Sequence, residues 1–245
     1  MGKYNFDKII DRRGTGSMMT DCLTKVFGRN DLSPLWIADM DFEVCPAISQ
    51  AIEKRAEHHI YGYSQAPDSY WESIIGWIKR RHNWDVTREE ITYVNGVVRG
   101  YAYALNFFTK PGDTIVIQQP VYHPFRNVAV GNHRRIVSND LIKNGDCYSM
   151  DLSGLEHIFA TENPKLMVVC NPHNPIGICW DKESLIEVAR LAKKYNVIIV
   201  SDEIHCDLGI FGHKHTPFAS VSEDAAAVSI SFGAPSKTFN IPGVS

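Results

Sequence analysis

The sequence predicts an α/β fold in which a mainly parallel sheet is covered by helices on both faces. Helix-like and strand-like segments alternate from about residue 92 to the end of the chain. Several strands are continuous apolar runs, such as residues 165–170, which is typical of strands buried on both faces of a parallel sheet. Conspicuous polar residues follow the strand ends, where open α/β sheets bind their ligands.

Two helices are predicted before this alternation begins. Ile48, Ile52 and Ala56 recur every four residues, which predicts a helix over residues 46–58. The same spacing of apolar residues predicts a second helix over residues 67–82, with a proline near its start.

The later elements follow from apolar runs and from their caps. Thr87 and Glu90 have the spacing of a capping box, a Pro-Gly pair at residues 111–112 ends one helix, and Asp181 is an N-cap for another. Strands are predicted over residues 92–94, 114–118, 135–137, 165–170, 197–201 and 227–232, and helices over residues 98–108, 124–131, 151–160 and 182–195.

Composition excludes several classes of protein. The 25 basic and 28 acidic residues give a net charge of −3, without the basic footprint of a nucleic-acid-binding protein. No apolar run approaches the roughly 20 residues of a membrane span, and the first ten residues lack a signal-peptide core. We therefore expect a cytoplasmic protein that binds neither nucleic acid nor membrane.

The histidines and cysteines do not predict a metal site. His58 and His59 are adjacent, so they point to different parts of a helix surface. His213 and His215 flank Lys214 with no carboxylate or thiol at ligand spacing. The six cysteines are irregularly spaced without a C-x-x-C pair, so we expect them to be reduced.

Four strand ends carry residues suited to chemistry. Taken singly, each has an ordinary explanation: a surface lysine, a rigid Asn-Pro turn, a helix-capping acidic pair and an aromatic residue at the rim of the core. The four segments are Gln119–Pro124 with Tyr122, Asn171–Gly177 with Asn174, Asp202–His205, and Gly233–Asn240 with Lys237.

Together, these segments resemble the pyridoxal-phosphate (PLP) enzymes of the aspartate-aminotransferase fold, the class I/II aminotransferase superfamily. The order of the motifs agrees, as do the spacings of 202 − 174 = 28 residues and 237 − 202 = 35 residues. The resemblance extends from about residue 34 to the end of the chain.

The resemblance implies a role for each motif residue toward PLP. Lys237 would bind the cofactor as a Schiff base, because PLP chemistry needs a lysine amine beside an electron sink. Asp202 would keep the pyridine nitrogen protonated, and Asn174 would donate to the phenolic oxygen of the ring. Tyr122 would stack on the ring. His205 stands where many relatives have a tyrosine that contacts the same oxygen.

The phosphate of the cofactor requires donors at a helix start. The backbone of Gly96, Val97 and Val98, which lies between a predicted strand and helix, fits this task, with Ser236 as a side-chain donor. Tyr61 resembles the tyrosine that reaches the phosphate of the neighbouring subunit, which implies a homodimer with a shared active site. Arg99 is either a further phosphate contact or an exposed helix residue.

Three segments indicate the reaction. Pro34–Phe42, Tyr61–Tyr63 and Ala234–Asn240 are similar to the cystathionine β-lyase (C–S lyase) subgroup often called MalY/PatB. This similarity implies a PLP-dependent carbon–sulfur β-lyase that cleaves cystathionine or related cysteine S-conjugates to pyruvate, ammonia and a thiol. Lys237 would then act as the general base. The Trp36–Phe42 segment would either line the substrate side or pack in the core.

Two alternatives stay open. A class I/II aminotransferase of an amino acid would use the same lysine, aspartate, asparagine and tyrosine, so these residues do not separate the two reactions. A catalytically idle PLP-fold binding protein is the third hypothesis, against which the presence of Lys237 and Asp202 argues.

The resemblance also implies a domain division. Residues 1–45 would belong with a small domain and residues 46–245 would form a truncated large PLP-binding domain. Lys237 lies 245 − 237 = 8 residues from the end of the chain, whereas family members continue into a C-terminal small domain with the arginine that binds the substrate carboxylate. We therefore expect this chain to lack the small domain and to bind PLP weakly as it stands.

Overall fold

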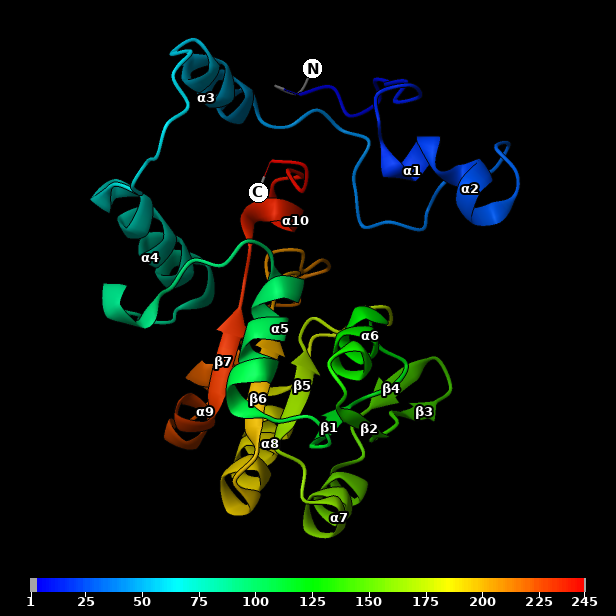
Figure 1. Ribbon diagram of the computed structural model, residues 1–245, viewed down its shortest axis with the longest axis vertical. Helices are drawn as coiled ribbons and strands as arrows, with labels where there is room; N and C mark the ends of the chain where they lie inside the picture. The colour runs from blue at the N-terminus through cyan, green and yellow to red at the C-terminus, as the bar shows by residue number, and fades with distance from the viewer. Residues whose placement is uncertain (1–3, 245) are drawn as a thin grey trace. The chain divides into compact units, whose positions relative to one another are not determined.

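The computed structural model describes residues 4–244, so the predictions that include residues 1–3 and Ser245 reach beyond the described part there. The chain forms two compact units (Figure 1): residues 1–64 with 235–245, and residues 65–234. The division into domains at residue 45 remains a prediction. Within residues 4–244, no helix is long and apolar enough to cross a membrane.

The larger unit is built on five parallel strands, which confirms the predicted fold class. The strand order is β2-β1-β5-β6-β7, so each sequence-distant pair is joined by a crossover. The strands are β1 (Thr114–Ile117), β2 (Arg135–Ser138), β5 (Leu166–Cys170), β6 (Ile198–Asp202) and β7 (Ser229–Phe232).

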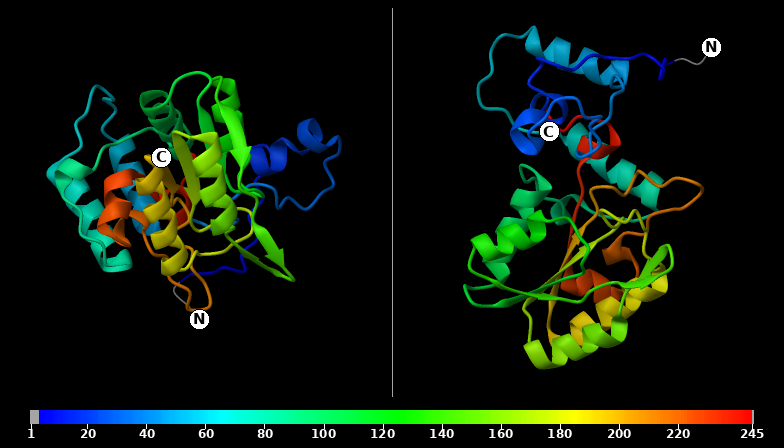
Figure 2. Two further views of the ribbon diagram at one scale, coloured as in Figure 1. Left: turned by 90° about the horizontal axis from the view of Figure 1, so that it is seen from below. Right: turned by 90° about the vertical axis from the view of Figure 1, so that its right-hand side faces the viewer.

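Helices cover both faces of this sheet, as Figure 2 shows. One face packs against α5 (Val97–Phe108) and α6 (Pro124–Gly131). The other face packs against helices whose apolar residues form a second core cluster. These are α7 (Leu152–Glu162), α8 (Lys182–Tyr195) and α9 (Glu223–Val228), with the 3-10 turn η2 (Phe218–Ser220).

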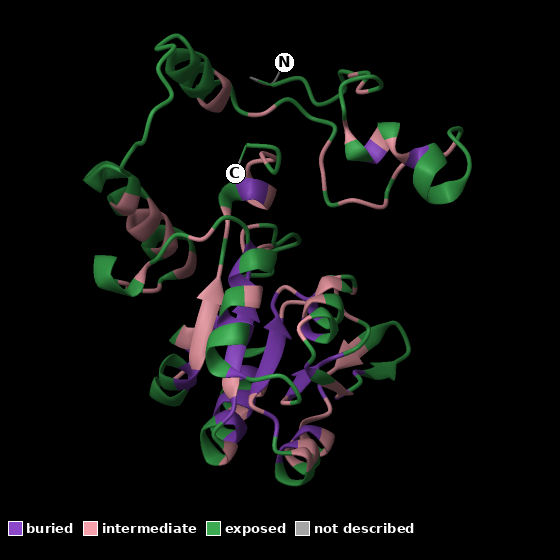
Figure 3. Cartoon of the chain, viewed as in Figure 1, coloured by how far each residue is buried: buried purple, intermediate pink, exposed green. Residues whose placement is uncertain are grey.

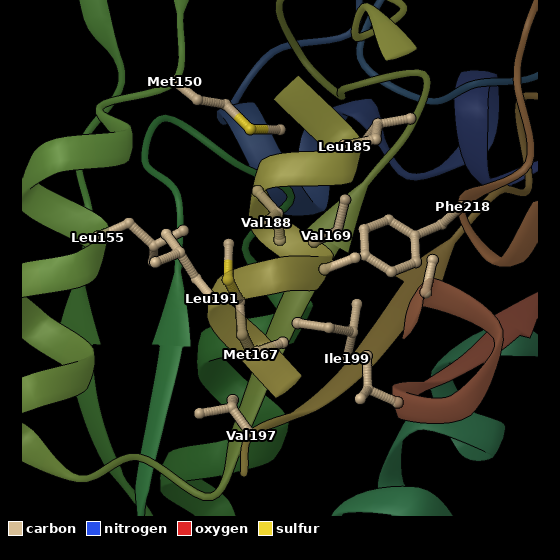
Figure 4. Close-up of a cluster of buried hydrophobic side chains, with 14 of the residues drawn as sticks. Met150, Leu155, Met167, Val169, Leu185, Val188, Leu191, Val197, Ile199 and Phe218 are labelled. Atoms are coloured by element: carbon tan, nitrogen blue, oxygen red, sulfur yellow. The ribbon is translucent and has the colours of Figure 1, made fainter. Parts of the chain in front are cut away.

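The central strands are buried throughout, which explains their continuous apolar sequence (Figure 3). In the cluster of Figure 4, Leu191 of α8 and Met167 of β5 are fully buried. Full burial of one such side chain stabilises the fold by about 1.5–3 kcal/mol. Helix α8 begins where Asp181 accepts a hydrogen bond from the backbone N–H of Ser184 at 2.7 Å, so the predicted cap is confirmed.

Most predicted elements are confirmed, with ends that move by at most two residues. The capping box of Thr87 and Glu90 is present, at the start of the 3-10 turn η1 (Arg88–Glu90). The two helices predicted ahead of the sheet are α3 (Pro46–Ala56) and α4 (Asp68–His82).

The predicted strand over residues 92–94 is wrong, because these residues pair with no strand in the described part of the chain. An extended apolar segment becomes a strand only when a neighbouring ladder satisfies its backbone groups. The predicted strand over 227–232 is shorter than expected, because its first two residues end α9. A hairpin of β3 (Ile142–Asn144) and β4 (Cys147–Ser149) was not predicted.

The smaller unit joins two segments that lie about 200 residues apart in sequence. The side chain of Asn240 accepts a hydrogen bond from the backbone N–H of Met40 at 3.0 Å and donates to the carbonyl oxygens of Met40 and Phe42. Arg12 pairs with Asp39 at 2.6 Å in the same region. The helices of this unit are α1 (Met18–Asp21), α2 (Leu23–Phe27), α3 and α10 (Pro235–Thr238).

Gly100 should tolerate no side chain, because α5 approaches β7 closely at this point. A Cβ atom on Gly100 would lie 2.5 Å from Cε1 of Phe232 and 3.0 Å from Cγ2 of Val94. We expect Gly100→Ala to lower the free energy of unfolding by about 1–3 kcal/mol, measured by thermal or urea denaturation. The matched control is Gly131→Ala, where a Cβ meets nothing within 4 Å. Equal stability of both variants would contradict the close packing.

Candidate active site

The carboxyl ends of neighbouring parallel strands bring three of the predicted site residues to one edge of the sheet. Cys170 of β5 and Asp202 of β6 are register partners, and the backbone N–H of Asn171 donates to the carbonyl oxygen of Asp202 at 2.9 Å. Tyr122 follows β1, the next strand along. Tyr122, Asn174 and Asp202 therefore arise from three adjacent strands, at the edge where parallel sheets bind ligands.

Asp202 is a buried carboxyl group with a raised pKa. The residue is only 5% exposed, and its Oδ1 accepts a hydrogen bond from the backbone N–H of Ile204 at 3.1 Å. Burial, with a smaller contribution from the charge of Glu203, raises the pKa of Asp202 to about 6. A buried carboxylate that has no positively charged partner among the described residues is suited to a cationic N–H donor.

Tyr122 lies within the electrostatic field of this carboxylate. Burial and the charge of Asp202 both raise the pKa of the half-buried Tyr122 phenol. Its ring packs edge-on against Phe125, with centroids 5.6 Å apart, which fixes the ring from one side. The side chain can therefore offer a flat aromatic face near Asp202, as stacking on a planar ligand requires.

The described contacts of Asn174 involve its backbone and leave its side-chain amide available. Its backbone N–H donates to Sγ of Cys170 at 3.4 Å, and the residue is half-buried. The amide side chain can thus donate to an oxygen acceptor placed at the end of β5.

The start of α5 has the properties of an anion site. Its N-cap is Gly96 with φ +90°, no side chain caps the helix, and the next residues are Val97 and Val98. Uncapped N–H groups at the start of a 12-residue helix attract phosphate. Arg99 is exposed and donates to the carbonyl oxygen of Asn95 at 3.5 Å, which favours the interpretation as a surface residue.

Lys237 and Ser236 belong to the smaller unit. Ser236 is buried, and the half-buried Lys237 donates from Nζ to the carbonyl oxygen of Ala38 at 2.9 Å. Lys237 follows the end of β7 by 237 − 232 = 5 residues, so the chain itself links it to the sheet. The meeting of Lys237 with Asp202 remains a prediction.

Two further predicted residues have contacts of their own. Tyr61 is exposed, donates from its hydroxyl to the carbonyl oxygen of Ala56 at 2.6 Å and has the Arg55 guanidinium 5.2 Å from its ring centre. His205 is half-buried just after β6. The roles of Tyr61 toward a partner subunit and of His205 toward the cofactor stay predictions.

Three side chains of metal-ligating type gather near His205. Atoms of His82, Cys206 and Asp207 lie within 4.8 Å of one another. The Asp207 carboxylate already accepts hydrogen bonds from Nε1 of Trp77 at 2.9 Å and Nε of Arg81 at 3.2 Å. We therefore interpret this cluster as a hydrogen-bonded link between α4 and the segment after β6.

Sequence reasoning missed two partners of the site. Glu203 is buried beside Asp202 and bonded to His215, but the eleven residues between them follow no helix or strand period that would have indicated the pairing. The carbonyl group of Ala38 is a backbone contact of Lys237, and a backbone group leaves no signal in the sequence.

Comparison with known proteins places this geometry in a family. Residues 31–244 match the family described as aminotransferase class I and II. Cystathionine β-lyase PatB of Bacillus subtilis (strain 168) is 43% identical over 240 residues, which cover 98% of this chain and 62% of that protein.

Two solved structures agree closely with the fold. Cystalysin from Treponema denticola, which contains pyridoxal 5'-phosphate, matches with a TM-score of 0.93 at 36% identity. The match covers 98% of this chain and 61% of the cystalysin chain. The PLP-bound C–S lyase from Staphylococcus hominis has a TM-score of 0.91 at 33% identity, over 99% and 62% of the two chains. The chain thus spans about three fifths of these relatives' lengths, and it belongs to the family of class I and II aminotransferases.

Proposed function

We propose that the protein is a PLP-dependent carbon–sulfur β-lyase that cleaves cystathionine or related cysteine S-conjugates. The observation that carries the cofactor assignment is the buried Asp202, whose carboxylate suits a pyridinium N–H. The β-lyase reaction is favoured by similarity over 98% of the chain to PatB, whose name is cystathionine β-lyase, and by the likeness to C–S lyase structures.

The donor set fits the cofactor group by group. Asp202 would accept from the pyridine nitrogen, Asn174 would donate to the phenolic oxygen and Tyr122 would stack on the ring. When bound, PLP supplies an electron sink for the pair left by breaking the Cα–H bond of a substrate. The N–H groups of Gly96, Val97 and Val98, with the hydroxyl of Ser236 and Tyr61 of a second subunit, would hold the phosphate.

Lys237 would act on the substrate through its amine nitrogen. A neutral amine can accept the Cα proton, which would make the lysine the general base. Loss of the thiolate from Cβ and hydrolysis of the remaining C–N bond then convert L-cystathionine and water into homocysteine, pyruvate and ammonia. His205 would assist at the phenolic oxygen that Asn174 also contacts.

The assembly and location belong to the same proposal. The expected role of Tyr61 requires a homodimer with a shared active site, and its exposed ring is compatible with a contact from another subunit. We propose a cytoplasmic enzyme with a small amino-acid substrate. The residues 1–45 and 46–245 would contribute to a small and a large domain of the whole protein.

An aminotransferase is the second candidate, because the family itself takes that name and the same residues serve both reactions. The full-length protein should release pyruvate from L-cystathionine over many turnovers without any keto acid, measured with a coupled dehydrogenase assay. A single stoichiometric conversion that restarts only when keto acid is added would instead establish the aminotransferase. If adding PLP caused no spectral change at all, the hypothesis of a catalytically idle protein with this fold would be favoured.

Lys237→Ala should remove covalent attachment of the cofactor and lower pyruvate release by about 10²–10⁴-fold, because the variant lacks the amine that binds and that accepts the proton. The measurements are the absorbance of the bound cofactor and the rate of pyruvate formation. Lys110→Ala, at an exposed lysine, is the matched control. Unchanged pyruvate release by Lys237→Ala would contradict the proposed role.

Asp202→Asn should stabilise the cofactor-free protein while it impairs catalysis. An acid whose pKa is higher in the folded chain (about 6) than its ordinary 3.8 binds its proton more tightly when folded, so stability falls as the pH rises between these values. Removing the charge should raise the free energy of unfolding at pH 8 by up to about 3 kcal/mol and change it little at pH 3.5.

The measurements are thermal denaturation without PLP at both pH values and pyruvate release with PLP, which should fall by about 10²–10³-fold. Asp146→Asn, at an exposed turn position, is the control. A loss of stability at pH 8 would show that Asp202 is not the desolvated carboxylate described above.

A further inference from the structure

Glu203 is bonded more fully than any role as a simple neighbour of Asp202 requires. Its Oε1 accepts hydrogen bonds from Oγ of Ser201 and Oγ of Ser231, each at 2.9 Å, and from the backbone N–H of Phe218 at 3.0 Å. Its Oε2 lies 2.8 Å from Nε2 of His215. The Glu203 and His215 side chains are 7% and 0% exposed, so these four contacts are shielded from water.

The network ties together three segments that meet at the end of β6. Ser201 of β6 and Ser231 of β7 are register partners, so one carboxylate oxygen joins the two strands. Phe218 begins η2, and His215 lies in the segment that leads to it. The backbone N–H of Glu203 also donates to the carbonyl oxygen of Phe232 at 2.8 Å. Both the backbone and the side chain of Glu203 are therefore anchored.

Asp202 and Glu203 occupy opposite faces of the sheet. Side chains alternate along a strand, and Ser201 and Glu203 share one face, as their hydrogen bond shows. Ile199 on that face packs in the core cluster of α7–α9, whereas Val200, on the face of Asp202, packs in the cluster of α5 and α6. Asp202 thus lies between Ser201 and Glu203, whose side chains are hydrogen-bonded to each other on the opposite face of the sheet.

We propose that Glu203 is a positioning residue for Asp202, which aims the Asp202 carboxylate by immobilising the end of β6 from the opposite face of the sheet. This inference rests on the proposed role of Asp202 toward the pyridine nitrogen. A displacement of the Asp202 carboxylate by a shift of the strand end requires the backbone of Glu203 to move, and such a movement breaks the buried contacts of Glu203.

The charge of Glu203 provides a second link between the residues. After burial, Glu203 is the group that raises the pKa of Asp202, whereas the hydrogen bond from Ile204 lowers it. Among the described residues, the Cys170 thiol of β5 and the Tyr122 phenol ahead of α6 also face Asp202, and burial together with the charge of Asp202 raises the pKa of each. A neutral side chain at position 203 should thus lower the pKa of Asp202.

The test compares Glu203→Gln, which retains an oxygen acceptor but no charge, with the exposed control Glu72→Gln. The Asp202 carboxyl is followed by ¹³C NMR in the cofactor-free protein, with its resonance assigned by loss in Asp202→Asn. Affinity for PLP and the kcat and KM for L-cystathionine are measured in the full-length protein. Ser231→Ala removes one donor and keeps the charge, in case Glu203→Gln does not fold.

We expect Glu203→Gln to lower the titration midpoint of Asp202 below about 6. It should weaken PLP binding and lower kcat by about 10–100-fold with little change in KM, as for outer-shell partners of metal ligands. Ser231→Ala should weaken PLP binding with the midpoint unchanged, and Glu72→Gln should match the original protein.

The experiment distinguishes failure of the Glu203 role from failure of the proposed function. If the original protein binds PLP normally and Glu203→Gln resembles Glu72→Gln in the midpoint, affinity and kcat, the role of Glu203 is overturned while the proposed function stands. If the original protein does not bind PLP at all, the proposed function is overturned, whatever the variants do.

Discussion

The pairing of β5 with β6 is the constraint on which the site depends. This ladder runs over five residue pairs, from Leu166 with Ile198 to Cys170 with Asp202. Side chains alternate along a strand, so a slip by one residue would turn Asp202 to the other face and bring a neighbour into its place. Except for the half-buried Ile198, the apolar residues of both strands are buried, and their burial holds the register that places the carboxylate and the segment of Asn174 at one edge.

Two acidic residues adjacent in sequence have opposite environments. Glu203 is surrounded by four hydrogen-bond partners, whereas the described contacts of the Asp202 carboxylate amount to one backbone N–H. The first arrangement satisfies a buried charge within the protein, and the second leaves it to be satisfied by a bound group. This contrast supports the proposals that Asp202 binds the cofactor and that Glu203 belongs to the framework.

The sequence was sufficient to predict the sheet, most helices and the strand-end residues, because buried parallel strands and cap residues leave local signals. The segment of residues 92–94 was misread, because an extended pattern is a local signal, whereas the lack of a pairing strand among the described residues is set by the tertiary fold. The hairpin around Gly145 was missed because the residues of β3 are exposed and carry no apolar alternation. The bond between Glu203 and His215 depends on how the segment after β6 folds back, which no spacing reveals.

Asn240, near the end of the described chain, is hydrogen-bonded to Met40 in the N-terminal part. Its partner Met40 lies 200 residues earlier, whereas the strands of the larger unit are joined by crossovers within residues 65–234. During synthesis, residues 36–42 leave the ribosome well before the segment that binds them, so they must wait in an unpaired state while the sheet assembles. The segment of Lys237 and Asn240 would then close the smaller unit as a late folding event, because contacts between residues far apart in sequence form slowly.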